Sequence, residues 1–177
     1  MLSGIAIAGL ALLSWSQPWF QVTLMTGLVL DVRGEQSAPA LSALAFAALA
    51  LSAALTIAGR VLRYLLGVVE VVIGLLMAGI ALATGSDPVA ASSSMITEAT
   101  AVAGSESVRE LVVDVAATPF PAVAIVAGVL LTLVGALVLV TARRWPDSSR
   151  RYEPTGADTT STSGAWDALT DGSDPTR

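Results

Sequence analysis

The chain has 177 residues, of which 54% are hydrophobic and only 13% are charged, about half the charged fraction of a soluble domain, so the composition indicates a membrane protein. A net charge of −5 argues against a nucleic-acid partner. Because the sequence contains neither Cys nor His, it lacks disulfides, thiolate nucleophiles and the commonest metal ligands, and we expect neither enzymatic activity nor a cofactor.

Four apolar segments approach or reach the roughly 20 residues that a helix needs to cross the hydrocarbon core of a bilayer. They are residues 1–16, 41–58, 64–83 and 121–142. The first is short, but it has neither a basic start nor a small-residue cleavage site, so we interpret it as a retained helix rather than a signal peptide. We predict an all-α membrane protein with a four-helix transmembrane domain over residues 1–142 and the lipid bilayer as its partner.

The arginines near the ends of these spans set the expected orientation, because basic residues resist translocation across the membrane. Arg60 and Arg63 fill the short turn between the second and third spans. Four more arginines follow the last span: Arg143, Arg144, Arg150 and Arg151. The other two connecting segments are acidic. We therefore predict a multi-pass protein of the inner membrane, with both termini in the cytoplasm and the two acidic segments outside.

The first outer segment has an alternation of apolar residues that predicts a short β-hairpin. Phe20, Val22 and Leu24 alternate with their neighbours, and a second alternating run follows a glycine. Trp15 and Trp19 stand at the start of this segment, where we expect their rings to anchor the protein at the outer membrane interface. A ligand-binding role of this aromatic-rich loop is the alternative.

Small residues at a spacing of four recur in the predicted spans, for example Gly74 with Ala78 and Ala124 with Gly128. Between helices in lipid the hydrophobic effect offers little, so close backbone approach must supply the contact. An Ala-rich chain also produces such pairs by chance. We conclude from them only that a compact bundle is feasible.

Glu70 is the ionisable residue that lies well inside a predicted span. An unpaired carboxylate in hydrocarbon costs about 2.5 kcal/mol or more on insertion scales, so Glu70 should face the bundle and find a partner. The polar side chains expected within reach are those of Ser52, Thr56, Thr132, Arg60 and Arg63. Two interpretations follow: a proton or cation relay, or a carboxyl group satisfied by an arginine or a hydroxyl, and we favour the second.

The second outer segment, residues 84–119, begins with a Ser- and Ala-rich stretch that we expect to be mobile. Ser107 and Glu110 then form a capping box, which predicts the start of a helix. Its apolar residues recur at near-helical spacing: Val108, Leu111, Val112 and Val115. We predict an amphipathic helix across the outer face of the bundle, either as a lid over a cavity or as a cover for apolar surface.

Residues 143–177 are polar and rich in Asp, Ser, Thr, Gly and Pro, which predicts a disordered cytoplasmic tail. Trp166 and Leu169 stand one helical turn apart near its end, beside Asp167. An apolar pair in a disordered segment is typical of a docking peptide, so we expect a cytoplasmic protein partner at this point. A solvated tail whose basic start attracts anionic lipid headgroups is the alternative.

Two elements of this tail, together with SQPWF after the first span and the R-x-x-R turn, carry a resemblance along the whole chain. They resemble the Trp-associated membrane protein family of actinobacteria. Ser149, Arg151, Tyr152 and Glu153 are similar to its S-S-R-Y-E element, with Arg150 inserted. The ending is similar to W-D-A-L-x-x-G-x-D-P-T at Trp166, Asp167, Ala168, Leu169, Gly172, Asp174, Pro175 and Thr176.

The resemblance implies a place beside tryptophan-biosynthesis genes and supplies no catalytic residues. Two functional hypotheses remain open. The first is an accessory protein that binds a partner through its tail. The second is a small exporter or channel subunit for tryptophan or an aromatic intermediate. Four short spans leave little room for a pathway, so the second hypothesis predicts a homo-oligomer.

Overall fold

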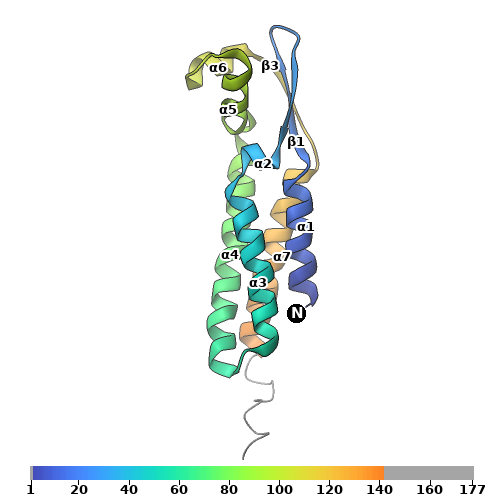
Figure 1. Ribbon diagram of the computed structural model, residues 1–177, viewed down its shortest axis with the longest axis vertical. Coiled ribbons are helices and arrows are strands. Elements are labelled where there is room, and N and C mark those ends of the chain that lie inside the picture. Colours follow the sequence, from blue (N-terminus) through green and yellow to red (C-terminus); the bar gives the residue numbers. More distant parts are fainter. Residues whose placement is uncertain (1, 142–177) are drawn as a thin grey trace, which may run out of the picture. The chain divides into compact units, whose positions relative to one another are not determined.

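Four helices lie side by side in the computed structural model, which describes residues 2–141 (Figure 1). They are α1 (Leu2–Trp15), α3 (Ala40–Ile57), α4 (Arg60–Ser86) and α7 (Phe120–Thr141). The principal contacts join α1 to α3 and α7, and α4 to α3 and α7. Each helix therefore touches two neighbours around a shared interior.

Three of these helices, α3, α4 and α7, are long and apolar enough to cross a membrane. The apolar helix α1 has 14 residues, which at a rise of about 1.5 Å per residue gives about 21 Å, against a hydrocarbon core of about 30 Å. Helix α4 is longer than its predicted span at both ends, since it begins at Arg60 and ends at Ser86. Arg60 and Arg63 therefore belong to its first turn. The connection between α3 and α4 is reduced to two residues, Ala58 and Gly59.

Helices α4 and α7 form the most extensive contact in the bundle, and glycines let their backbones meet. A Cβ atom on Gly128 would lie 2.5 Å from the amide nitrogen of Ala78 and 2.8 Å from the carbonyl oxygen of Gly74. A Cβ atom on Gly135 would lie 2.8 Å from the amide nitrogen of Val71. Small residues thus make close contact at Gly74 and Gly128, where the neighbouring backbone occupies the space of the missing side chains.

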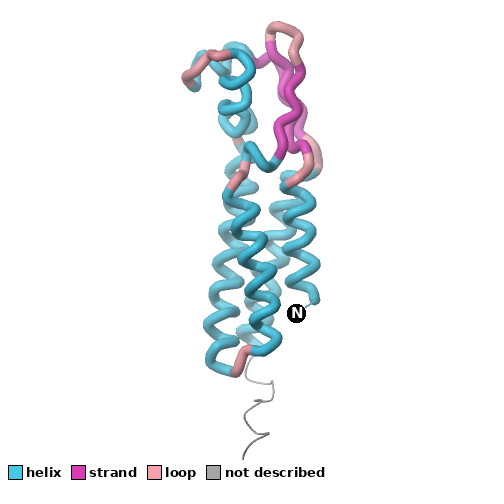
Figure 2. Tube along the Cα trace, viewed as in Figure 1, coloured by secondary structure: helices cyan, strands magenta, loops and turns pink. Residues whose placement is uncertain are grey.

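Beyond one end of the four helices lies a second layer, residues 16–38 and 87–119, which we call the head (Figure 2). It holds a three-stranded sheet of β1 (Pro18–Leu24), β2 (Val29–Arg33) and β3 (Val112–Ala117), in the order β2-β1-β3. Three short helices complete it: α2 (Gly34–Ser37), α5 (Pro88–Thr100) and α6 (Ser105–Leu111). The two connecting segments, far apart in the sequence, therefore build one structure.

The predicted hairpin is present as β1 and β2, whose antiparallel register pairs Phe20 with Val32 and Val22 with Leu30. The alternation of β1 turns Phe20, Val22 and Leu24 into the core of the head. The register shifts between Pro18 and Phe20, so Trp19 points into the same core. A sequence pattern of period two does not reveal such an irregularity.

The predicted amphipathic helix is wrong for its second half, because the chain is helical only from Ser105 to Leu111 and then forms β3. The capping box is also wrong, since the N-cap is Gly104 and no side chain caps the helix. Strand β3 pairs Val115 with Val22 of β1. β-Branched residues suit a strand, and without β3 this edge of β1 would be left unpaired.

The Ser- and Ala-rich stretch that we expected to be mobile forms the 13-residue helix α5. Asp87 caps its first turn by accepting a hydrogen bond from the amide of Ala90, and Pro88 occupies the first helical position. An N-cap Asp followed by Pro is a recognised helix start. The sequence therefore carries a local signal for α5 within a stretch of low-complexity composition.

Candidate functional site

Glu70 lies in the interior of the four-helix bundle with 1% of its surface exposed. The hydroxyl of Ser52 on α3 donates a long hydrogen bond of 3.5 Å to its Oε1 atom. Its Oε2 atom is buried and has no hydrogen-bond partner among the described residues. The prediction that Glu70 faces the bundle is confirmed, and Ser52 is its hydrogen-bond partner among the described residues.

Three of the other polar side chains expected near Glu70 donate hydrogen bonds to backbone carbonyl groups. The hydroxyl of Thr56 donates to the carbonyl of Ala53, and that of Thr132 donates to the carbonyl of Gly128. Arg63 is buried and donates from Nη2 to the carbonyl oxygen of Ala58 at 2.7 Å. Arg63 therefore caps the last turn of α3, where carbonyl groups lack partners within their own helix.

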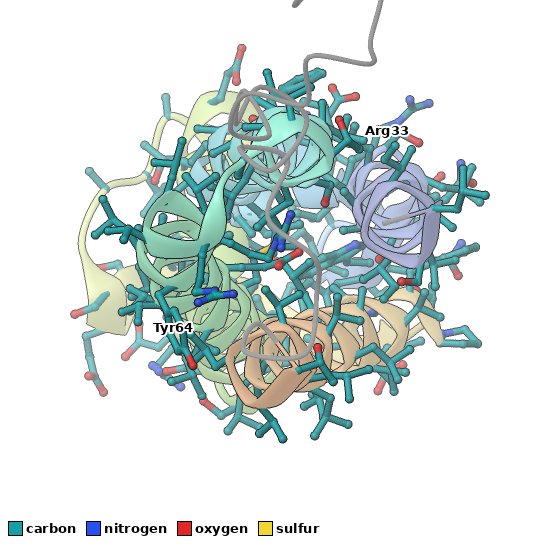
Figure 3. All side chains as sticks on the ribbon, turned by 90° about the horizontal axis from the view of Figure 1, so that it is seen from below. Arg33 and Tyr64 are labelled. Atoms are coloured by element: carbon teal, nitrogen blue, oxygen red, sulfur yellow. The ribbon has the colours of Figure 1, made fainter. Side chains whose placement is uncertain are left out.

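The interior above Glu70, on the side of the head, is apolar and filled. Eight buried residues form this cluster: Ala8, Ala11, Ala45, Ala48, Ile73, Met77, Ala127 and Leu131. Two come from each of the four helices. Figure 3 views the bundle end-on from the side of the α3–α4 turn, where Tyr64 marks the first turns of α4. Glu70 and Ser52 thus lie between this end and the apolar cluster.

Helix α1 reaches the level of Glu70 with its first residues. Gly4 packs against Ser52, and a Cβ atom at Gly4 would approach Glu70 Oε1 to 3.2 Å. The glycine is therefore required by the close approach of α1 to α3 and α4 at the carboxyl group. No local pattern in the sequence indicates that Gly4 belongs to this cluster.

Trp19 does not anchor the protein at a membrane interface as expected, because it is fully buried in the head. Its Nε1 donates a hydrogen bond of 2.8 Å to the carbonyl of Ser14 at the end of α1, and its ring meets Phe20 edge-on. Trp15 is half-buried and packs against the same core. Trp19 therefore joins the head to the bundle.

Four further candidates fall in the tail: Tyr152, Trp166, Asp167 and Leu169. They lie outside the described residues, as does the predicted tail over 143–177. Their role as a docking peptide stays a prediction.

A groove between α5 and α6 is a second candidate site, which the sequence did not reveal. It encloses about 460 Å³ and is lined from α5 by Val89, Ala90, Ser93, Ser94 and Thr97, and from the α6 side by Gly104, Ser105, Val108 and Arg109. Val108 is buried, whereas Ser94 and Arg109 are exposed. The groove thus combines an apolar floor with hydroxyl groups and one charged side chain.

Arg109 at the mouth of this groove forms an ion pair with Asp87, the N-cap of α5. The backbone amide of Ala90, which donates to Asp87, holds the pKa of that carboxyl below its usual range, and the guanidinium of Arg109 lowers the pKa further. Asp87 is therefore ionised near neutral pH. Arg109 lines the groove, and Asp87, which is outside the lining, lies beside it as its ion-pair partner.

Apolar helices long enough to span a bilayer indicate a transmembrane protein, and such helices imply contact with the lipid bilayer. The chain belongs to the tryptophan-associated transmembrane protein family, whose model matches residues 1–176. This confirms the family inferred from the tail motifs. No curated protein and no solved structure matches the chain.

Proposed function

We propose that this protein is a non-enzymatic accessory membrane protein associated with tryptophan biosynthesis, and that it acts by binding a partner. The observation that carries this proposal is the filled interior of the bundle. Backbone contact at Gly74 and Gly128 closes α4 against α7, and the apolar cluster separates Glu70 from the head. A solute that crosses between the helices would have to part them. We therefore expect a partner to bind at surfaces outside the interior of the bundle.

The pairing within the head supports the proposed topology. Strands β1 and β2 precede α3, whereas β3 follows α4, and all three share one sheet. Both segments must therefore lie on the same side of the membrane, which favours α3 and α4 as a pair of crossings. Arg60 and Arg63 lie at the opposite end, so the positive-inside rule supports our proposal that the head is outside and both termini are in the cytoplasm.

The test is crosslinking and affinity capture from native membranes, comparing the full chain with a chain that lacks residues 165–177. We expect a specific partner to be lost from the shortened chain. A Trp166→Ala, Leu169→Ala double variant should lose it too, whereas Thr170→Ala, in the same segment, should retain it. Capture of the same partners by the full and shortened chains would contradict docking through the tail.

An exporter or channel subunit is the second candidate, and the buried Oε2 atom of Glu70 without a described partner favours it. Because one bundle is filled, such a path would have to form between copies of the chain. Radiolabelled tryptophan flux into proteoliposomes tests this candidate, with Glu70→Gln as the variant. Flux above that of empty vesicles that falls in Glu70→Gln at unchanged protein content would favour transport. Flux equal to that of empty vesicles would exclude it.

A further inference from the structure

We propose that the groove between α5 and α6 binds a small zwitterionic amino acid with an apolar side chain. The site lies in the head and is independent of the partner binding proposed for residues 165–177. It is distinct from the Glu70 cluster inside the bundle.

The size and floor of the groove suit a small molecule. Its volume of about 460 Å³ falls within the range of about 300 to 1,000 Å³ that is typical of ligand sites. Val89 and Val108 give it an apolar floor, with Val108 held in the core of the head. A ligand with an apolar side chain would cover the half-buried side chain of Val89 and remove its remaining apolar surface from water.

The hydroxyls of the groove are free to meet a ligand. On the other face of α5, Ser92 donates to the carbonyl of Pro88, and Thr100 donates to that of Ile96. Within the described residues no hydrogen bond involves the side chains of the four lining hydroxyl residues, which are Ser93, Ser94, Thr97 and Ser105. Their oxygen atoms can accept a hydrogen bond from a ligand N–H, such as that of an indole ring.

The charge pair at the mouth selects the class of ligand. Asp87 and Arg109 are bound to each other, and their side chains keep 43% and 49% of their surface exposed. A simple anion would be attracted by Arg109 and repelled by Asp87. A simple cation would be attracted by Asp87 and repelled by Arg109. A zwitterion satisfies both, with its carboxylate on the guanidinium and its ammonium group on the carboxylate.

Binding to the purified full-length protein in lipid nanodiscs tests the proposal, with L-tryptophan as the probe because of the family's association. Equilibrium dialysis with labelled ligand should show saturable binding. Tryptamine, which lacks the carboxylate, and indole-3-propionate, which lacks the ammonium group, should each bind about tenfold more weakly or worse, the loss expected for one charge-assisted hydrogen bond. Equal binding of the three compounds would overturn the proposal.

Two charge variants sharpen the test. Arg109→Gln should weaken tryptophan about tenfold. Asp87→Asn preserves the helix cap, because Asn is an equally good N-cap residue, so it removes the charge without removing α5. This variant should weaken tryptophan but strengthen indole-3-propionate, because Arg109 is then released from its ion pair. If the ion pair had only a structural role, Asp87→Asn would not change the two affinities in opposite directions. Affinities that change in the same direction, or not at all, would overturn the proposal that the ion pair binds the charges of the ligand.

A steric pair of variants locates the site. Ser94→Phe should fill the groove and abolish binding, whereas Ser107→Phe, exposed on α6 and outside the lining, should bind like the unaltered chain. Equal helix content and melting temperature of the two variants would show that both fold. Unchanged tryptophan binding in Ser94→Phe would refute the groove as the site. The chain without residues 165–177 should bind tryptophan fully, which separates this proposal from that of tail docking.

Discussion

Small residues line two helix contacts in this protein, with opposite results. Between α4 and α7, glycines at positions 74, 128 and 135 bring backbone against backbone and leave no space for even a methyl group. Between α5 and α6, the α5 face is built of similarly small residues, Ala90, Ser93 and Ser94, yet it lines a groove. Spacing of small residues is therefore compatible with either a contact or a cavity.

The difference comes from the length and course of the partner helix. Helix α7 has 22 residues and runs along most of α4, so its backbone can follow the glycines turn by turn. Helix α6 has seven residues, after which the chain turns into β3 to pair with β1. The sheet thus draws the chain away from α5 before the helices can close on each other.

The largest expected effect separates the head from the bundle. Trp19→Ala should destabilise the head by about 3–5 kcal/mol, the cost of truncating a buried aromatic side chain, and should remove the hydrogen bond to Ser14. Hydrogen exchange should show lost protection in the sheet while the centres of α4 and α7 stay protected. Met25→Ala, which is exposed at the hairpin turn, is the control. Equal loss of protection in both layers would show that they fold as one unit.

The next effect tests the closed contact. Gly128→Ala should lower the free energy of unfolding by about 1–3 kcal/mol, because the added Cβ meets backbone atoms that cannot move without parting the helices. Gly79→Ala on α4 is the matched control, since its Cβ would meet nothing within 4 Å. Unfolding in mixed detergent measures both. A stable Gly128→Ala variant would mean that α4 and α7 are farther apart in the membrane.

A substitution in the groove between α5 and α6 should change the stability much less. Ser94→Phe places a large side chain in the groove, and we expect its free energy of unfolding to stay within about 0.5 kcal/mol of the unaltered chain, as for ordinary surface substitutions. Thermal melting of the purified protein checks this. A loss as large as that of Gly128→Ala would show that α5 and α6 close on each other in solution.

The smallest effect is one of pH. Because the pKa of Asp87 is lowered in the folded protein, its ionised form stabilises the start of α5. This contribution is fully present above the usual aspartate pKa of about 3.9 and is lost as the pH falls through the lowered pKa. The protection factors of the α5 amides, which correct for the slower intrinsic exchange at low pH, should therefore fall on acidification. Asp87→Asn should flatten this dependence while retaining the cap, and an unchanged profile in the variant would assign the effect to another group.

Features with a strong local period could be predicted from the sequence. The three long apolar helices and the β1–β2 hairpin follow from periodicity, and the inward orientation of Glu70 follows from the cost of exposing a carboxylate to lipid. The sequence did not reveal β3, because its partner strand lies about ninety residues earlier. The burial of Trp19 was hidden by the irregularity after Pro18. The groove depends on where α6 ends, which long-range pairing decides.

The pairing of β1 with β3 has a consequence for how the protein is made. Phe20 pairs with Ala117, so the central strand keeps one open edge during synthesis until both α3 and α4 have been made. Contacts between such distant segments form slowly, and open strand edges are prone to aggregate. Biogenesis of the head therefore depends on prompt insertion of α3 and α4, and a delay in that step would expose an unfinished sheet.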